Sequence, residues 1–413
     1  MHCVKYVFII LLMEYLNFHF YVTTVPNILQ KSIYWGIPAI YVLYKYKEVT
    51  AIYKNNHNKK YISYSLLFLA VAFGWCIFVV FINDTNDWSY FKLLMAVVHY
   101  MLISITFYFM LNDYKNGNVF YMYCVTYIAT IFLCVISTLF FLQNFDYRFA
   151  WQSIIVSSDY QAGAYEIAEN ITRFGLPGMM VFGETIKCSI GVLFSCMLLY
   201  RGYLIGVLGL FISLLGNLFY GRIGVLLSFI CVIVLLAEKI SIKFVSAICL
   251  TVLLLYVILN NLEMTELLYW LEWLYNPIES FFHGLSVGQF SLGSSADDLV
   301  ENMYFVPDDV TFLWGDGRYT DASGYQYMST DAGYMRIILF GGLPLAFFVY
   351  GAFLLLSFAT YKNFGTNNKF MQKVVLVLVI MFFISEYKGD AYCIFFGVVS
   401  FLNLISCDNV KCN

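Results

Sequence analysis

The sequence predicts an all-α fold, a polytopic transmembrane helical bundle of about twelve spans with one large periplasmic loop. Hydrophobic residues make up 61% of the 413 residues and charged residues only 12%, about half the charged share of a soluble globular chain. The apolar residues also fall in blocks long enough to cross a hydrocarbon core of ~30 Å. Composition therefore places the whole chain, 1–413, in a bilayer as a single membrane domain.

Apolar periodicity and the breaks between blocks predict where the spans lie. No small-residue cleavage site follows 1–22, so we expect this segment to be a retained first helix. Two outer loops are long, 143–176 and 261–333, and the second opens on Leu262 to Tyr275, either an interfacial helix or an extension of the ninth span. The expected spans are 4–22, 32–44, 61–82, 90–111, 119–142, 177–200, 202–219, 223–237, 241–260, 334–358, 372–386 and 390–405.

Lysine placement predicts the orientation. The loop after the second span carries five lysines between Lys45 and Lys60, and short cytoplasmic loops are rich in Lys and Arg. Placing that loop in the cytoplasm puts 13 of the 17 lysines on the same side. Both termini are then cytoplasmic.

Several classes of function are disfavoured by composition. The net charge is −3, and no basic stripe interleaved with aromatic residues indicates a nucleic-acid partner. Most of the 11 cysteines lie inside apolar blocks, where cysteine behaves as a small hydrophobic residue. The sequence has no metal-ligand motif, so we expect no metal and no cofactor.

Arginine is distributed in the opposite way to lysine. Five of the six arginines fall on the outer side of the predicted topology, against the insertion bias. The planar guanidinium binds phosphate or carboxylate through two hydrogen bonds, so an outer cluster suits an anionic group carried on a lipid. The alternative is that each arginine pairs with an acidic residue or with lipid phosphates. The five are Arg148, Arg173, Arg222, Arg318 and Arg336.

Two of these arginines lie among glycines. Arg222 lies in Tyr220-Gly221-Arg222-Ile223-Gly224, a predicted tight outer turn in which the glycines would let a ligand approach closely. Arg318 follows Gly315-Asp316-Gly317, whose N–H groups would either bind an anion or form a plain turn.

Asp331 and Arg336 lie at the outer mouth of the tenth span. A carboxylate near guanidinium groups could take a proton from a sugar hydroxyl. The alternative is that Thr330 or Asp331 is the N-cap of the following helix.

Other charged residues have simpler expected roles. Glu184 and Lys187 should pair with each other within one span, and Glu14 and His99 should be satisfied inside the bundle. Glu386, Lys388 and Asp390 form a charged outer turn. His283 is a weak candidate, and the pairs Asp297-Asp298 and Asp308-Asp309 are metal ligands or, more simply, solvated loop charge.

Five motifs together resemble Wzy-type O-antigen polymerases. The segments Leu313–Asp321 and Ser329–Leu343 resemble the late outer loop and following helix of that family. The motifs Thr172–Leu176, Gly221–Gly224 and Glu386–Asp390 add to the likeness. The related O-antigen ligases place a His-Asn pair where this chain has Asp331-Ala332, and this departure disfavours a ligase.

The resemblance implies a metal-independent glycosyltransferase in the inner membrane of a Gram-negative bacterium. Such an enzyme transfers the growing chain from undecaprenyl pyrophosphate onto a new lipid-linked repeat unit, with membrane lipid around it and a chain-length regulator as a possible partner. Catalysis would then fall to Asp331, Arg222 and Arg318. Substrate binding would fall to Arg173, Arg336, Arg148, Lys388 and Glu386.

Two other functions remain open. A flippase for lipid-linked oligosaccharides also has about twelve spans, but we would expect short loops and charges lining a central cavity. An O-antigen ligase would use lipid A-core as its acceptor.

Overall fold

The computed structural model describes residues 2–18, 20–113, 118–157, 174–179, 182–236, 299–321, 324–365 and 368–409. Within these ranges six helices are long and apolar enough to cross a membrane, which confirms a helical membrane architecture. The count of twelve spans stays a prediction, because the expected span 241–260 lies outside the described residues. The six are α4 (Lys59–Ile82), α5 (Ser89–Asn112), α6 (Val119–Gln143), α9 (Phe182–Tyr200), α16 (Gly333–Phe364) and α17 (Lys369–Lys388).

The remaining helices are shorter. Five of them fall on expected spans, namely α1 (His2–Phe18), α2 (Asn27–Tyr44), α10 (Ile205–Tyr220), α11 (Arg222–Leu236) and α18 (Tyr392–Asn409). Three connect the spans, namely α3 (Tyr46–Asn55), α7 (Phe145–Ile154) and α15 (Asp309–Trp314). A π-turn covers Leu299–Met303 and a 3-10 turn covers Tyr327–Ser329.

Two short antiparallel strand pairs correct the ends of two predicted spans. The first helix ends at Phe18, and β1 (Phe20–Val22) pairs with β2 (Ile155–Ser157) instead of continuing the helix. The sixth span begins at Phe182 rather than at 177, because β3 (Phe174–Gly175) turns back onto β4 (Gly178–Met179). Leu176 and Pro177 form the turn between β3 and β4, and Gly178, the first residue of β4, has a φ of +98°.

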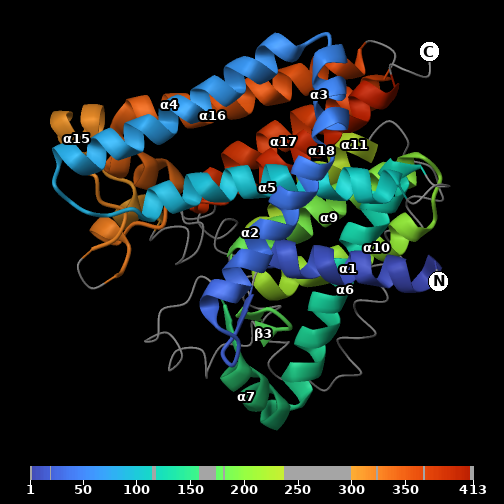
Figure 1. The fold of residues 1–413 in the computed structure, drawn as a ribbon. Coiled ribbons are helices and arrows are strands. Elements are labelled where there is room, and N and C mark those ends of the chain that lie inside the picture. The colour runs from blue at the N-terminus through green and yellow to red at the C-terminus, as the bar shows by residue number, and fades with distance from the viewer. Residues whose placement is uncertain are drawn as a thin grey trace, which may run out of the picture.

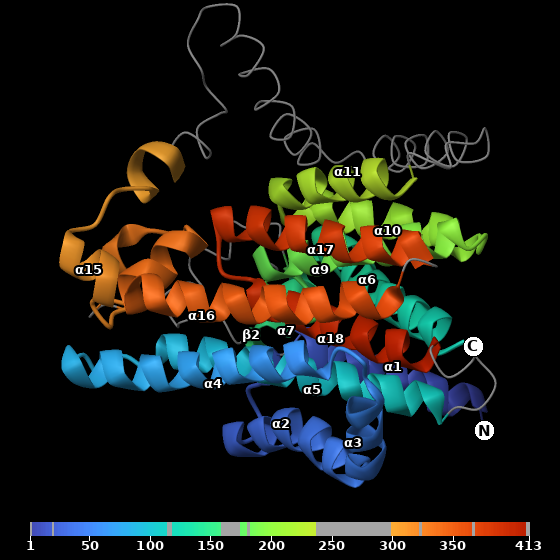
Figure 2. The same cartoon turned by 90° about the horizontal axis from the view of Figure 1, so that it is seen from above.

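The helices pack in pairs around a buried α9. Figures 1 and 2 show α4 lying along α16, with α17 and α18 beside them. Ser65 of α4 donates to the Ala352 carbonyl of α16 (2.7 Å), which ties the two helices together. On the other side, α10 approaches α9 closely, since a Cβ on Gly209 would lie 2.6 Å from Ser195 Oγ. Small residues at such crossings let membrane helices pack backbone to backbone.

Helix α16 is kinked inside the bundle. Gly342 has φ +66° and ψ −171°, values that no helical residue adopts, and Pro344 follows two residues later. Proline carries no N–H, so the carbonyl of Phe340 has no helical donor four residues ahead of it. Trp75 of α4 donates its indole N–H to the Gly341 carbonyl (2.7 Å) at the same bend. The kink therefore leaves backbone acceptors open on one side of α16.

The bundle has two distinct ends. In both views α15 lies at one end, whereas α3 and the chain labels N and C lie at the other (Figures 1 and 2). Termini at one end agree with an even number of crossings. Which end faces the cytoplasm stays a prediction. We call the end with α15 the α15 end and the other the α3 end.

Candidate functional site

The segment that carries Arg318 is anchored to the kink of α16. Asp316 donates its backbone N–H to the Leu339 carbonyl (2.7 Å), and Gly317 donates to the Phe340 carbonyl (2.9 Å). These are the acceptors that Gly342 and Pro344 free within α16. Both N–H groups therefore hold the loop in place, and they are not available to an anion. These contacts agree with the alternative that the glycines form a plain turn.

Glycine is required at positions 315 and 317 by backbone shape and by space. Gly315 and Gly317 have φ of +77° and +65°, a region that favours glycine. A Cβ on Gly315 would lie 2.5 Å from the Gly341 nitrogen, and one on Gly317 would lie 3.1 Å from the Val79 carbonyl oxygen. Thr85, in the loop between α4 and α5, donates to the Gly317 carbonyl (2.6 Å). The segment is thus fixed against α16 and against α4.

Asp87 holds the residues that follow Arg318. Its Oδ2 accepts the backbone N–H of Tyr319 (2.7 Å) and of Thr320 (2.8 Å). Half-burial alone would raise the pKa of the Asp87 carboxyl, but hydrogen bonds from Thr320, Ser89 and Tyr319 outweigh it and lower that pKa. Asp87 is therefore charged at neutral pH and grips two consecutive amides.

A buried ion pair lies behind this loop. Arg336 Nη1 is 2.9 Å from Asp390 Oδ2, and the two side chains are 14% and 3% exposed. The same Asp390 oxygen accepts a hydrogen bond from the Tyr319 hydroxyl. The Arg336 guanidinium stacks over the Tyr319 ring, with its Cζ 3.7 Å from the ring centroid. Arg336, Tyr319 and Asp390 thus form one contact network across three segments.

The electrostatics of this network are set by burial and by nearby charges. Burial raises the pKa of the Asp390 carboxyl, Arg336 and the Tyr319 hydroxyl lower it in part, and the Asp331 carboxylate raises it further. Burial, followed by the charge on Asp390, raises the pKa of Tyr319 well above its ordinary value. The Tyr319 hydroxyl therefore stays protonated at neutral pH and acts as a donor.

Glu386 adds a second buried carboxylate next to the pair. Its side chain is fully buried, and its Oε2 accepts a hydrogen bond from Tyr350 of α16 (3.2 Å). Space around it is tight, because a Cβ on Gly333 would lie 2.8 Å from the Glu386 carbonyl oxygen and 2.9 Å from Oε2. Gly333 thus lets the start of α16 approach the turn between α17 and α18. The two motifs 329–336 and 386–390, far apart in sequence, meet here.

Three buried polar atoms of this cluster have no hydrogen-bond partner among the described residues. They are Arg336 Nε, Asp390 Oδ1 and Glu386 Oε1. Buried polar groups are nearly always paired in folded proteins, so these atoms indicate that water or a ligand completes the site. One donor and two acceptors suit a polar, hydroxylated ligand better than an apolar one.

Asp331 lies at the edge of the cluster and is half-buried. The N-cap residue of α16 is Ala332, with no side-chain hydrogen bond at the cap. Thr330 accepts the Ala332 N–H (3.2 Å) and donates to the Met303 carbonyl (2.9 Å). Asp331 therefore does not cap α16. Its carboxylate interacts electrostatically with the Arg336 guanidinium and with the Asp390 carboxylate.

Arg318 is the exposed cation of the site. Its backbone is fixed on both sides, whereas its side chain is exposed and lies with Cζ 5.9 Å from the Tyr327 ring centroid. Tyr327 in turn donates its hydroxyl to Asp316 (3.1 Å). Arg318 forms no ion pair within the described ranges. A guanidinium on a rigid backbone loses little entropy when it binds an anion.

Of the other predicted site residues, Arg148 lies in an element apart from this cluster and Lys388 lies next to it in sequence. Arg148 is buried in α7, with its Cζ 5.6 Å from the Phe174 ring of β3, and α7 lies well apart from α15 in Figure 1. Arg173 lies outside the described residues, and only the backbone of Arg222, at the start of α11, is described. Lys388 ends α17, between Glu386 and Asp390.

The space beside Gly221 and Gly224 is filled by protein. Gly221 ends α10 as predicted, but a Cβ there would lie 2.8 Å from Thr185 Oγ1. A Cβ on Gly224 would lie 2.5 Å from the Thr185 methyl carbon and would also meet the Asn217 side chain. These glycines make room for α9 and α10, which corrects their expected role in admitting a ligand.

Several charged residues have structural contacts. Lys187 and Glu184 pair as predicted, at 3.2 Å. Glu14 accepts a hydrogen bond from Cys134 (2.9 Å), although its Oε2 has no partner among the described residues. Buried His99 lies against Tyr34, with ring centroids 3.9 Å apart. Asp308 caps α15 through the N–H groups of Val310 and Thr311 (3.0 Å each), which gives it a structural role. His283, Asp297-Asp298 and the segment 262–275 lie outside the described residues.

Sequence reasoning missed Asp87, Tyr319 and Tyr350 as site residues. Asp87 and Tyr319 are 232 positions apart, and no local pattern pairs them. A signal was present in Asp87-Trp88-Ser89, because Asp87 accepts the Ser89 N–H (2.9 Å) and so stands at the start of α5.

Within the described ranges, no group of three or more His, Cys, Asp and Glu side chains is placed to hold a metal ion. Comparison with known proteins finds no family model, no curated protein and no solved structure that matches this chain.

Proposed function

We propose that this chain polymerises O-antigen repeat units at the periplasmic face of the Gram-negative inner membrane. In this reaction an acceptor hydroxyl oxygen forms a bond to C1 of the donor sugar. The bond from C1 to the pyrophosphate oxygen breaks, and undecaprenyl pyrophosphate leaves with the electron pair. The hydroxyl proton passes to a carboxylate. A good leaving group needs charge stabilisation more than it needs a proton.

The observation that carries the proposal is the unsatisfied cluster at the α15 end. Buried Arg336 Nε, Asp390 Oδ1 and Glu386 Oε1 lie beside the half-buried Asp331 and near the loop that presents Arg318. A sugar hydroxyl can both donate and accept hydrogen bonds, and the exposed guanidinium suits a pyrophosphate. This is the combination that a lipid-pyrophosphate-linked glycan would need.

The contacts change the role that we give to Arg336. Its charge is already balanced by Asp390 at 2.9 Å, so the cation for the pyrophosphate is Arg318, with Arg173 and Arg222 as further ligands. Arg336 instead positions Tyr319 and Asp390. We assign the acceptor-side base to Asp331, because its carboxylate is half-buried and does not cap a helix. Lys388 and Glu386 remain proposed substrate contacts, whereas Arg148, buried in α7 apart from this cluster, is not assigned to the site.

Replacing Arg318 by Ala tests the pyrophosphate role. We expect polymerisation to fall on the order of 10²- to 10³-fold, the usual cost of removing one preorganised charge donor. The measurement is the ladder of chain lengths formed from lipid-linked repeats presented to the purified protein. Lys92→Ala is the matched control, since Lys92 is also an exposed cation near the α15 end, at the start of α5. A normal ladder from Arg318→Ala would refute the role.

Replacing Asp331 by Asn tests the base. Asn keeps the size of Asp331 and removes its negative charge, so a loss of about 10²-fold or more is expected if the carboxylate takes the proton. Full activity would overturn the assignment.

The same assay separates the rival functions. A flippase would move lipid-linked repeats across vesicles without joining them, and a ligase would attach them to lipid A-core. Cells that make core plus one repeat after loss of this chain would indicate a polymerase, whereas bare core would indicate a ligase.

A further inference from the structure

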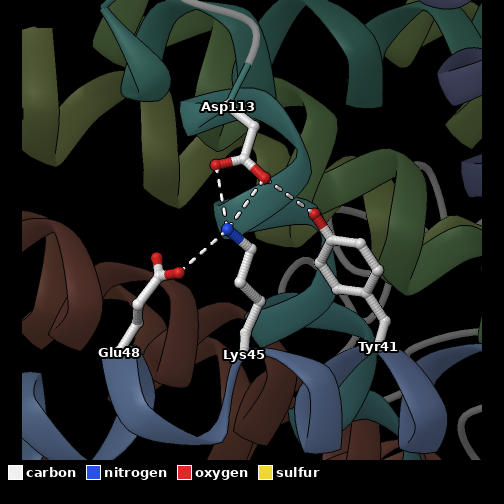
Figure 3. A network of polar contacts seen from close by, with 4 residues as sticks. All are labelled: Tyr41, Lys45, Glu48 and Asp113. Carbon is white, nitrogen blue, oxygen red and sulfur yellow. Dashed lines mark hydrogen bonds and ion pairs between the residues drawn. The ribbon is translucent and has the colours of Figure 1, made fainter.

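At the α3 end of the bundle, two acidic residues both contact one lysine. Lys45 Nζ lies 3.0 Å from Glu48 Oε1 and 3.0 Å from Asp113 Oδ2. Tyr41 donates its hydroxyl to the same Asp113 carboxylate (3.2 Å). Figure 3 shows the four side chains converging from α2, α3 and the end of α5. Hydrogen bonds to Glu48 and Asp113 raise the pKa of Lys45.

The neighbouring lysines have no such partner. Lys47 and Lys54 on α3 and Lys59 and Lys60 at the start of α4 are all exposed, and none forms an ion pair within the described ranges. Lys59 Nζ instead donates to the backbone carbonyl of Lys54 (3.4 Å), which places the Lys59 ammonium at the end of α3. Lys45 offsets only one of the two negative charges of Glu48 and Asp113. Five lysines, Lys45 included, against two acids still leave a net positive charge of three for an external anion.

The end of α16 extends this basic surface. Asn58, the N-cap residue of α4, donates to Asn363 near the end of α16 (2.7 Å). Lys60 Nζ lies 4.9 Å from the Tyr61 ring centroid, and Lys362 Nζ lies 5.1 Å from that of Phe358. The Tyr61 and Phe358 rings meet edge to face at 4.9 Å. The exposed Lys362 thus joins the lysines of α3 and α4. We call these five lysines, 47, 54, 59, 60 and 362, the basic corner.

Aromatic side chains place the basic corner at a membrane surface. Tyr44 and Tyr46 are 78% and 62% exposed, at the junction of α2 and α3. Figures 1 and 2 show α3 running across α4 rather than along it. Tyrosine is enriched where the hydrocarbon meets the headgroups, and a short helix with basic residues lies in that layer. This setting suits lysines that contact lipid phosphates.

We propose that the basic corner is a binding site for anionic phospholipid headgroups, such as phosphatidylglycerol. Five ammonium groups beside interfacial tyrosines match a phosphodiester at the bilayer surface, because anionic headgroups attract basic residues close to the surface. This site lies at the far end of the bundle from Arg318 and Asp331, so it does not depend on the proposed polymerase activity.

The test compares two double variants of the full chain. Lys54→Gln with Lys59→Gln removes two charges from the basic corner. Lys31→Gln with Lys92→Gln removes two exposed lysines near the starts of α2 and α5, outside the corner. Each protein is placed in nanodiscs with equal phosphatidylglycerol and phosphatidylethanolamine, then released and weighed with its retained lipids by native mass spectrometry.

We expect the unaltered protein to retain phosphatidylglycerol preferentially. The corner variant should lose this preference by on the order of tenfold, and the Lys31/Lys92 variant should keep it. Lys54→Arg with Lys59→Arg should retain it too, because the charge is preserved. Equal retention in both Gln variants, or equal loss in both, would overturn the site, since either result would show that lipid preference does not come from this corner.

Discussion

The two ends of the bundle each hold a cation between acidic and aromatic groups, but they differ in the burial of the acid. At the α15 end Arg336 pairs with Asp390, whose side chain is 3% exposed. At the α3 end Lys45 pairs with Glu48 and Asp113, which are 52% and 48% exposed. Bulk solvent screens the second pair much more than it screens the buried first pair. Two ion pairs with similar N···O distances are therefore expected to contribute very different free energies to stability.

The choice of cation follows the same division. Arg336 stacks its guanidinium face on Tyr319 while its edge pairs with Asp390, and only a planar, delocalised cation can do both. Lys45 is a point charge on a flexible stem and contacts two acids that approach from different helices. Arginine at the α15 end and lysine at the α3 end thus reflect the kind of contact that each makes. The predictions below test this contrast.

The largest expected effect is the loss of the buried cation. Arg336→Met leaves Asp390 buried without its partner, and this should cost about 3–5 kcal/mol of unfolding free energy. Thermal unfolding in detergent measures it. The double change Arg336→Met with Asp390→Leu should recover most of the loss, because no unpaired charge remains. If the single variant unfolded at the same temperature as the unaltered protein, Arg336 and Asp390 would not be coupled as described.

The second prediction concerns the glycine that lets the Arg318 loop reach the kink. Gly315→Ala places a methyl group against the Phe340 carbonyl and Gly341 nitrogen at a φ of +77°, and this should cost about 1–3 kcal/mol. Hydrogen exchange should rise at the amides of Asp316 and Gly317, which donate to α16. Gly365→Ala is the control, because Gly365 has φ +61° but open space around it. Equal exchange in both variants would contradict a requirement for close approach.

The third prediction is a pH dependence confined to the Asp87 clamp. The pKa of Asp87 is lowered in the folded chain, so the stability it contributes is present above the ordinary pKa of about 4. It is lost as pH falls through the folded value. Below about pH 4 in the unaltered protein, the Tyr319 and Thr320 amides should therefore lose protection from exchange relative to unstructured amides at the same pH. In Asp87→Asn the exchange should be raised already at neutral pH. A clamp that opened as pH rose would contradict this sign.

Sequence reasoning predicted the helices better than it predicted the site. Apolar blocks are long and local, so α4, α5 and α6 begin and end within two residues of expectation. The kink of α16 had a local signal in Gly341-Gly342-Leu343-Pro344. The N–H groups that donate to the carbonyls at this kink, those of Asp316 and Gly317, lie in a loop. Such long-range pairings depend on tertiary packing and leave no periodic pattern.

The candidate site was predicted only in part for the same reason. The charged turn Glu386–Asp390 and the segment around Arg336 were singled out by composition, and the structure brings them together. That Arg336 would be neutralised by Asp390, rather than left for an anion, depends on a distance that the sequence does not contain. Asp87 was missed because an aspartate in a short polar loop looks like any solvated residue.

The smallest expected effect lies at the α3 end. Asp113→Asn removes one of the two acids around Lys45, but both acids are about half exposed and Glu48 remains. The change should therefore cost less than about 1 kcal/mol of unfolding free energy. It should also vanish in 1 M salt, where the screening length is about 3 Å. Thermal unfolding at low and high salt measures the loss of stability and its dependence on salt. The same measurement on Arg336→Met should show a loss of stability that persists in high salt, because the Arg336–Asp390 pair is shielded from ions. A loss of several kcal/mol from Asp113→Asn, unchanged by salt, would mean that the exposure of the acidic side chain does not explain a difference in ion-pair energy between the two ends.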